Sequence, residues 1–299
     1  MSVKRRSSDD SRETLARAWA WHTWHPGWLP GHLVGAIRRL ALHRLARKGL
    51  AECRLDSGQR FLADPGEVIQ CHIGARGEWE GEIYQALRPL VGPGDTVLDV
   101  GAHVGYSTLL FAQWVGPSGK VYSFEPFAPL VEQIRANVSL NAFDERVEII
   151  SAGVSDVAGN ADFYKPRGSN SGVGSLAKPG KKATPVSIQT LRLDDWIRTH
   201  ELTGVALCKL DIEGAEGRAL AGMAEALGAH VAAAFLIELH PPELLMLGDS
   251  VHGVLRTLAE AGYEIRYWGR SSVFANRPDA DGCAYVLALA RDIPQRVAM

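Results

Sequence analysis

Residues 97–105 read Val-Leu-Asp-Val-Gly-Ala-His-Val-Gly. The largely apolar run 96–100 predicts a short buried strand with Asp99 next to its end. Gly101 follows at once, where the backbone must turn sharply and let another group approach closely. Gly105 then opens an apolar segment that suits a helix packed on a sheet. A strand, a glycine turn and a helix predict a ligand-binding corner, because the turn exposes backbone N–H groups and a helix N-terminus favours an anion.

The spacing of the two glycines indicates which ligand the corner suits. The pattern is D-x-G-x-x-x-G, which differs from the dinucleotide fingerprint G-x-G-x-x-G. We expect it to bind S-adenosylmethionine (SAM) rather than NAD. An NAD-dependent oxidoreductase stays an alternative, with the missing third glycine against it.

Beyond the corner, short strands alternate with helices of about a dozen residues. Further strands are expected at 120–124, 147–151, 206–210 and 232–237, with helices at 128–141, 216–227 and 251–261. This alternation predicts βαβ units with right-handed crossovers. The last two strands, 263–268 and 284–290, have no helix between them and must pair antiparallel. We therefore expect an α/β fold with a mostly parallel seven-stranded sheet, helices on both faces and an antiparallel last strand. This is the Rossmann-like arrangement of class I methyltransferases.

Two segments depart from this alternation. Residues 1–60 are expected to form a basic, tryptophan-rich helical segment ahead of a main domain at 61–299, and they carry 12 Lys+Arg against 5 Asp+Glu. The amphipathic helix predicted at 31–48 fits a lid, a homodimer contact or an anionic membrane surface, and we expect no nucleic acid partner. Residues 153–186, rich in Gly, Ser and Lys, are expected to be a loop near the substrate or a surface hairpin.

Composition excludes several classes of protein. The apolar fraction of 46% supports a sizeable core, and the longest purely apolar run, 231–237, is too short to span a bilayer. Four scattered cysteines without a C-x-x-C pair argue against a disulfide framework or a zinc site. Because no apolar signal core follows the charged residues at the start of the sequence, we expect a cytoplasmic protein.

Polar residues stand where the expected parallel strands end, the edge at which ligands of open α/β sheets bind. Glu125 follows the second strand, where a carboxylate can accept hydrogen bonds from two ribose hydroxyls. Asp211 and Glu213 follow the fourth strand, and Glu238 and His240 follow the fifth. Together with the glycine corner, Glu125 predicts a nucleoside ligand.

Several short motifs resemble the FkbM family of SAM-dependent methyltransferases. They are G-E-W-E (77–80), D-V-G-A-H-V-G-Y-S (99–107), F-E-P (124–126), S-D (155–156), L-D-D-W (193–196), K-L-D-I-E-G-A-E (209–216) and E-L-H-P (238–241). The resemblance covers roughly residues 70–290, and K-x-D-x-E-G-x-E is its most specific part. The family commonly has Asn at the position of His103, whose backbone role survives this change.

The resemblance implies methyl transfer from SAM to a hydroxyl oxygen of a sugar, a glycoconjugate or a polyketide-type natural product. It implies cofactor contacts from Glu80, Asp99, Gly101, Ala102, His103, Gly105, Tyr106, Ser107, Glu125, Pro126, Ser155, Asp156 and Asp211. Gly101 and the turn 102–105 would hold the methionine part, Glu125 the ribose, and residues 155–156 the adenine.

The transfer needs a base to remove the hydroxyl proton while donor and acceptor are aligned. We expect His240 to be this base, because the ordinary pKa of a histidine lies near working pH. Asp211 would orient the imidazole or the substrate, and Glu213 is a further candidate base. A less favoured alternative is a Mg²⁺ ion held by Asp211, Glu213 and either Glu238 or His240, which would acidify the hydroxyl. In another, the D-x-E-G-x-E block only caps the following helix.

Two further functions compete with O-methyl transfer. N-methyltransferases that carry an N-P-P-Y turn after the fourth strand are not favoured, since this chain has Asp-Ile-Glu-Gly at 211–214. A non-catalytic SAM-binding protein, recruited through residues 1–60, stays an alternative.

Overall fold

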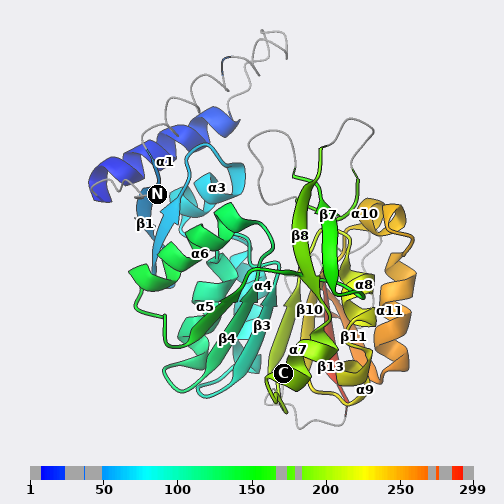
Figure 1. Ribbon diagram of the computed structural model, residues 1–299. Helices are drawn as coiled ribbons and strands as arrows, with labels where there is room; N and C mark the ends of the chain where they lie inside the picture. Colours follow the sequence, from blue (N-terminus) through cyan, green and yellow to red (C-terminus); the bar gives the residue numbers. More distant parts are fainter. Residues whose placement is uncertain are drawn as a thin grey trace. The chain divides into compact units, whose positions relative to one another are not determined.

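The computed structural model describes residues 8–23, 37, 49–165, 174–178, 184–268, 274–275 and 285–291 (Figure 1). The chain divides into two compact units. The first comprises Met1–Glu80, Ser139–Asn141 and Pro166–Gly172, and the second comprises Gly81–Val138, Ala142–Lys165 and Val173–Met299. The helix predicted at 31–48, with its lid, homodimer and membrane contacts, lies outside the described residues apart from Ile37. The division into 1–60 and 61–299 stays a prediction.

In its described residues, the first unit contains two helices and a hairpin. These are α1 (Ser8–Thr23), β1 (Ala51–Arg54), β2 (Arg60–Ala63) and α3 (Val68–Arg76), with β1 and β2 antiparallel. Ala18 of α1 and Cys71 of α3 pack together in a small buried cluster, and the Cys71 thiol donates to the Leu15 carbonyl at 3.3 Å. The two helices therefore cover each other's apolar faces.

The second unit is built on one large sheet. Its strands are β3 (Thr96–Val100), β4 (Lys120–Phe124), β5 (Val147–Ile150), β9 (Leu207–Leu210), β10 (Ala234–Glu238), β11 (Tyr263–Trp268), β12 (Phe274–Ala275) and β13 (Tyr285–Ala290). Their order is β12-β11-β13-β10-β9-β3-β4-β5. The pairs from β10 to β5 are parallel, while β13 runs antiparallel to both β10 and β11. The predicted seven-stranded sheet is confirmed, and the two-residue β12 adds an edge strand.

Helices cover both faces of this sheet (Figure 1). They are α4 (Gly81–Leu87), followed by a 3₁₀ turn (Arg88–Leu90), α5 (Tyr106–Val115), α6 (Ala128–Leu140), α7 (Leu193–Thr199), α8 (Glu216–Ala221), α9 (Ala224–Gly228), α10 (Pro241–Met246) and α11 (Val251–Glu260). Leu98 and Val100 of β3 join a core with α7, α8, α9 and α11. The alternate residue Asp99 is hydrogen-bonded from α5, because successive side chains of a strand point to opposite faces.

The single helix expected at 216–227 is instead two helices, α8 and α9. Buried Asp194 accepts hydrogen bonds from the N–H groups of Glu225 (3.1 Å) and Ala226 (2.9 Å) and so caps α9. A Cβ on Gly222, between the helices, would lie 2.1 Å from the Ser155 carbonyl oxygen. Both contacts come from distant segments, so helical periodicity alone did not reveal the break.

The segment that interrupts the alternation forms a small sheet of its own. Strands β6 (Gly153–Val154), β7 (Gly159–Phe163) and β8 (Val186–Leu191) lie in the order β6-β8-β7, with β7 and β8 antiparallel. An isolated antiparallel bridge, Tyr164 to Ser175, follows β7. The hairpin expectation is confirmed in part, and residues 166–173 and 179–183 lie outside the described chain.

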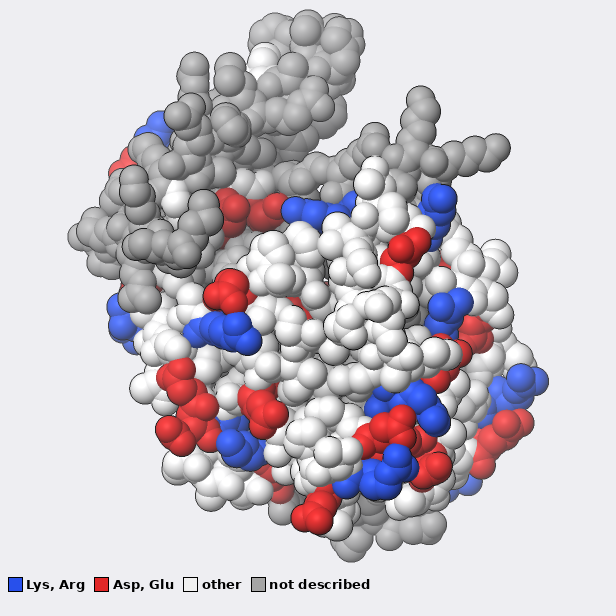
Figure 2. All heavy atoms as spheres, in the orientation of Figure 1, with Lys and Arg blue, Asp and Glu red and all other residues white. Residues whose placement is uncertain are grey.

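On the face of the molecule in Figure 2, the described acidic and basic side chains are interspersed around uncharged surface, as is typical of a solvated face. Among the described helices, none is long and apolar enough to cross a membrane.

Candidate active site

The glycine turn lies where β3 ends and α5 begins. Gly101 has φ 83°, and a Cβ on it would lie 1.8 Å from the Asp211 carbonyl oxygen. The N–H groups of Gly101 and Ala102 donate to the Phe124 carbonyl at 3.0 and 3.1 Å. Gly105, at φ 86°, lies against Ile134, whose Cγ2 would be 3.2 Å from a Cβ. Only glycine fits at the first position, and the turn is packed against the ends of β4 and β9.

Asp99 supports this turn from within the core. Its side chain is fully buried and accepts hydrogen bonds from the hydroxyls of Ser107 (2.8 Å) and Thr108 (2.6 Å). Burial raises the pKa of Asp99, although Lys209 and the two hydroxyls oppose this shift. These contacts tie β3 to α5, and the predicted cofactor contacts of Asp99 and Ser107 stay predictions.

Glu125, directly after β4, is joined to the same turn. It is 5% exposed, and its two carboxylate oxygens accept the N–H groups of His103 (3.1 Å) and Phe127 (2.9 Å). Burial raises the pKa of Glu125 to about 8, although both N–H groups favour the charged form. Burial also lowers the pKa of the His103 ring to about 4, so this imidazole is neutral at pH 7. Glu125 is thus held in one orientation beside the glycine turn.

Lys209 connects the turn to the acidic block after β9. Its side chain is 6% exposed, and its ammonium donates to the Gly101 carbonyl at 3.3 Å and to Asp211 at 3.1 Å. Asp99 lies 3.8 Å from the same nitrogen. Burial alone would lower the pKa of Lys209, but Asp211 and Asp99 outweigh it and raise the pKa. Burial would likewise raise the pKa of Asp211, but Lys209 and then His240 outweigh it, so this pair is ionised.

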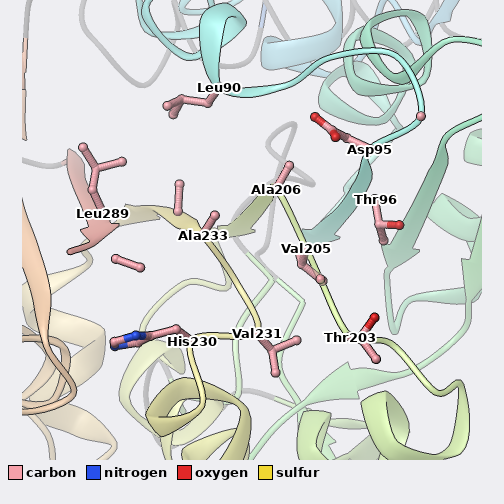
Figure 3. A pocket seen from close by; sticks show the side chains of 14 residues that line it. Leu90, Asp95, Thr96, Thr203, Val205, Ala206, His230, Val231, Ala233 and Leu289 are labelled. Carbon is pink, nitrogen blue, oxygen red and sulfur yellow. The ribbon is translucent and has the colours of Figure 1, made fainter. Parts of the chain in front are cut away.

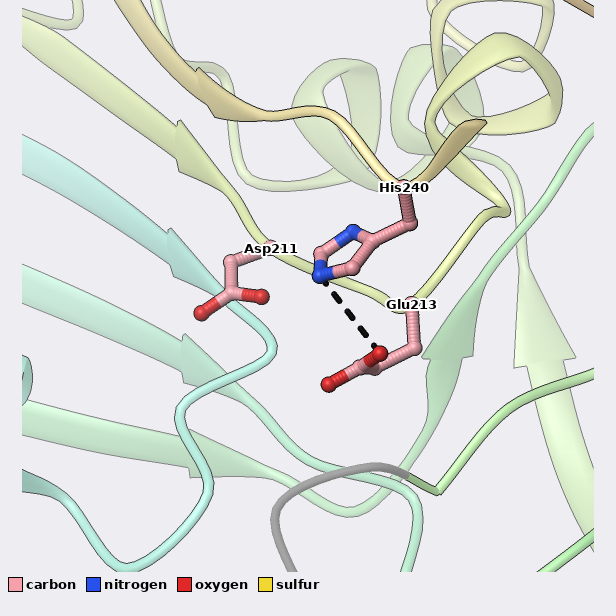
Figure 4. Close-up of side chains that lie close together, drawn as sticks. All are labelled: Asp211, Glu213 and His240. Atoms are coloured by element: carbon pink, nitrogen blue, oxygen red, sulfur yellow. Dashed lines mark ion pairs between the residues drawn. The ribbon is translucent and has the colours of Figure 1, made fainter. Parts of the chain in front are cut away.

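His240 stands among carboxylates at the end of β10 (Figure 4). Its Nε2 atom lies 3.4 Å from Oε2 of Glu213 and 3.7 Å from Oε1 of Glu238. Its Nδ1 atom lies 3.1 Å from Oε1 of Glu216. Glu238 also accepts a hydrogen bond of 2.6 Å from the Tyr285 hydroxyl. The strand ends of β9 and β10 therefore bring together the polar residues that the sequence placed there.

The pKa of His240 differs from the ordinary histidine value expected from the sequence, and the pKa of Glu213 is shifted as well. Burial would lower the pKa of His240, but the hydrogen bond to Glu216 and the charges of Glu213 and Asp211 raise it to about 9. Burial raises the pKa of Glu213 to about 7, with His240 opposing. The imidazole is therefore protonated at neutral pH in the free protein, because several carboxylates face it at once.

Residues 99–265 match the family described as the methyltransferase FkbM domain. The chain belongs to the FkbM methyltransferase family. This membership argues against the NAD-dependent oxidoreductase alternative.

Two relatives and one solved structure are similar to this chain. The 2-O-methyltransferase NoeI of Sinorhizobium fredii is 27% identical over 157 residues, which cover 48% of this chain and 63% of NoeI. The 31-O-demethyl-FK506 methyltransferase FkbM of Streptomyces tacrolimicus is 28% identical over 160 residues, covering 45% and 61%. The chain thus spans less than two thirds of either relative. The solved methyltransferase FkbM of Methylobacillus flagellatus has a TM-score of 0.43 and 14% identity, with 94% of this chain and 58% of that one covered.

The remaining residues, which the FkbM resemblance implies as cofactor contacts, have other partners in the structure. Buried Ser155 follows β6 and donates to Asp156 at 2.9 Å, and a Cβ on the nearby Gly153 would lie 3.7 Å from the Pro126 ring. Tyr106 is buried against Tyr84, with ring centroids 5.6 Å apart. Their cofactor contacts stay predictions. So does that of Glu80, which belongs to the first unit.

Lys209 and Glu216 also belong to this cluster, although the sequence motifs predicted no site role for either residue. Both lie in the K-x-D-x-E-G-x-E block. Their place in this motif is the sequence signal that could have identified them. Their roles became visible only through the partners they meet in space.

A possible cation position lies in the same cluster. One ligand atom each from Asp211, Glu213 and His240 can be chosen so that all three lie within 4.8 Å of one another. Such a set has the donor types that divalent cations accept. Asp211 already pairs with Lys209, so a cation there would compete with an ammonium.

A separate pocket of about 370 Å³ lies at the opposite edge of the sheet (Figure 3). It is lined by residues at the amino ends of parallel strands, among them Thr96, Ala206 and Ala234, and by His230. None of the predicted site residues lines it. Ligands of open α/β sheets bind at the carboxyl ends of the strands, so this pocket is not the expected active site.

Proposed function

We propose that this protein is a SAM-dependent O-methyltransferase that acts on a hydroxyl of a sugar, a glycoconjugate or a polyketide-type natural product. The observation that carries the proposal is one buried cation, Lys209, hydrogen-bonded both to the glycine turn through Gly101 and to the acidic cluster through Asp211. A cofactor corner and a set of proton acceptors thereby share one edge of the sheet. The names of the relatives NoeI and FkbM, a 2-O- and a 31-O-methyltransferase, support O-methylation.

The residues present fit SAM. Each Glu125 oxygen accepts one backbone N–H, and a carboxylate oxygen can accept a second hydrogen bond, as two ribose hydroxyls require. The site also carries more carboxylates than cations: Asp99, Asp211, Glu213, Glu216 and Glu238 face Lys209 and His240. This negative excess suits a cationic ligand. When bound, SAM supplies a methyl group activated by a positively charged sulfur.

His240 is proposed to take the proton of the acceptor hydroxyl at Nε2, the ring nitrogen that faces Glu213. With SAM bound, loss of this proton would accompany transfer of the methyl group to the acceptor oxygen, which would give a methyl ether and S-adenosylhomocysteine. At neutral pH the free protein holds His240 protonated. His240 can therefore act as the base only after this proton has left the ring. Glu213, whose Oε2 lies 3.4 Å from Nε2, nearer than Glu238 at 3.7 Å, is the candidate to receive it.

The test separates cofactor binding from turnover. Calorimetry is expected to detect binding of S-adenosylhomocysteine and none of NADH. Transfer of labelled methyl from SAM is then followed on a panel of hydroxylated sugars and polyketides by mass spectrometry. His240→Asn should bind S-adenosylhomocysteine as the unmodified protein does and lose about 100-fold or more in turnover.

A matched control is His252→Asn, which removes an exposed histidine of α11 and should change neither property. A protein that does not bind S-adenosylhomocysteine would overturn the proposal of SAM use. Unchanged turnover in His240→Asn would overturn the assignment of the base. Cofactor binding without methylation of any acceptor would favour the non-catalytic alternative.

A further inference from the structure

We propose that Glu216 is the positioning residue that fixes the imidazole of His240 with Nε2 toward the acceptor side, an inference that rests on the proposed function of His240. Oε1 of Glu216 lies 3.1 Å from Nδ1 of His240. Asp211, which the sequence suggested for this task, is hydrogen-bonded instead to Lys209. The pairing therefore assigns the orienting task to a residue five positions after the carboxylate that the sequence favoured.

Glu216 has the burial and the contacts that such a task requires. Its side chain is 0% exposed, although burying a carboxylate is costly unless it is paired. The same Oε1 atom accepts the N–H of Gly214 at 3.0 Å, and Oε2 is buried with no hydrogen-bond partner among the residues that the structure describes. One carboxylate oxygen thus serves a backbone donor and the imidazole together, so the carboxylate is fixed relative to both.

The backbone around this contact is fixed as well. Gly214 has φ 97°, and a Cβ there would lie 2.3 Å from Cβ of Glu243 in α10. The turn before α8 and the start of α10 are therefore in direct contact. Because His240 immediately precedes α10, the donor and acceptor of the Glu216–His240 contact sit on two segments that cannot separate without losing this packing.

The contact with Glu216 determines which nitrogen of the His240 ring faces the acceptor. With Nδ1 held by Glu216, Nε2 faces Glu213 at 3.4 Å and Glu238 at 3.7 Å. A carboxylate bonded to one ring nitrogen sets the tautomer and the orientation of a catalytic histidine. If the ring rotated, the contact between Nδ1 and Glu216 would be lost and the wrong ring nitrogen would face the acceptor.

The first readout is spectroscopic and independent of turnover. In protein labelled with ¹⁵N-histidine, His240 is expected to give a downfield Nδ1–H proton resonance, assigned by its loss in His240→Asn. Glu216→Ala should abolish this resonance, and Glu216→Gln, which keeps an acceptor oxygen without the charge, should move it upfield. The matched control is Glu225→Gln, because Glu225 stands in the first turn of the neighbouring helix α9 with its side chain 78% exposed.

The second readout is kinetic. Glu216→Ala should lower kcat by up to about 100-fold, as expected for a misplaced base, and leave the KM for SAM and the affinity for S-adenosylhomocysteine within about twofold. Glu216→Gln should restore part of the rate. If Glu216→Ala does not fold, Glu216→Gln carries the kinetic test, since it is isosteric.

Absence of the downfield resonance in the unmodified protein, its persistence in Glu216→Ala, or an unchanged kcat in a variant that has lost it would each overturn the proposal. Unchanged turnover in His240→Asn with the resonance lost on removal of Glu216 would instead contradict the proposed function of His240. The two failures are thus distinguishable.

Discussion

The ammonium nitrogen of Lys209 lies 3.3 Å from the carbonyl oxygen of Gly101, 108 positions earlier in the chain. The same nitrogen is 3.1 Å from Oδ2 of Asp211 and 3.8 Å from Oδ1 of Asp99. One buried cation therefore compensates two buried carboxylates and fixes the glycine turn between them. The ends of β3 and β9 are coupled through a single side chain.

Replacement of Lys209 by methionine should destabilise the fold and weaken cofactor binding together. Removing one partner of a buried ion pair leaves an uncompensated charge and costs about 3–5 kcal/mol. The free energy of unfolding in urea and the affinity for S-adenosylhomocysteine measure the two effects. Lys120→Met, at an exposed position that starts β4, should change stability by less than about 0.5 kcal/mol. Equal stability of the two variants would contradict the role given to Lys209.

Gly101→Ala should abolish cofactor binding and lower the melting temperature strongly. The new Cβ would lie 1.8 Å from the Asp211 carbonyl oxygen, so the turn and the end of β9 would have to move apart. Gly248→Ala is the matched control, because Gly248 has nearly the same φ (84° against 83°) and no atom of the described chain would lie within 4 Å of its Cβ. It should cost only the strain of a left-handed backbone, about 1–2 kcal/mol. Similar losses in the two variants would show that the conformation, and not the close approach, requires glycine at position 101.

The fold was predictable because it depends on local patterns. The alternation of apolar strands and helices predicted the seven strands. The position of polar residues at the strand ends predicted four candidate site residues, Glu125, Asp211, Glu213 and His240. What the patterns could not give were pairings between distant segments. Asp194 caps α9 from about 30 positions away, which splits a helix that is continuous in its periodicity.

The same limit applies to the chemistry of the site. The pKa of His240 is raised by Glu216, Glu213 and Asp211 together. These three carboxylates belong to one motif and meet the histidine of another motif only in the folded chain. The orienting carboxylate was expected to be Asp211, since it ends the neighbouring strand. It is Glu216 that lies 3.1 Å from the ring, because Lys209 pairs with Asp211.

Glu125 should make stability depend on pH in a recognisable direction. Burial raises its pKa from the ordinary value of 4.5 to about 8 in the folded protein. Between these pH values the folded state keeps a proton that the unfolded state releases, so stability should fall as pH rises from about 4.5 and level off above about 8. Glu125→Gln cannot titrate and should lack this component. The difference in free energy of unfolding between the two proteins, measured from pH 5 to 9, isolates it.

The exposed Glu132 of α6 supplies the control for this measurement. Glu132→Gln should follow the pH dependence of the unmodified protein. Parallel profiles for Glu125→Gln and the unmodified protein would contradict the raised pKa of Glu125. S-adenosylhomocysteine should reduce the difference, because hydroxyl donors favour the ionised carboxylate.

Removal of divalent cations should leave turnover and S-adenosylhomocysteine affinity within about twofold. The three candidate ligand atoms of Asp211, Glu213 and His240 lie within 4.8 Å of one another, but Asp211 already holds the Lys209 ammonium at 3.1 Å. A cation must also displace the proton on His240, whose pKa is raised to about 9. Rates are compared before and after dialysis against a chelator, and Mn²⁺ binding is titrated by calorimetry. A rate that the chelator abolishes and Mg²⁺ restores, together with Mn²⁺ binding lost in Asp211→Asn, would replace the general-base mechanism with a metal-assisted one.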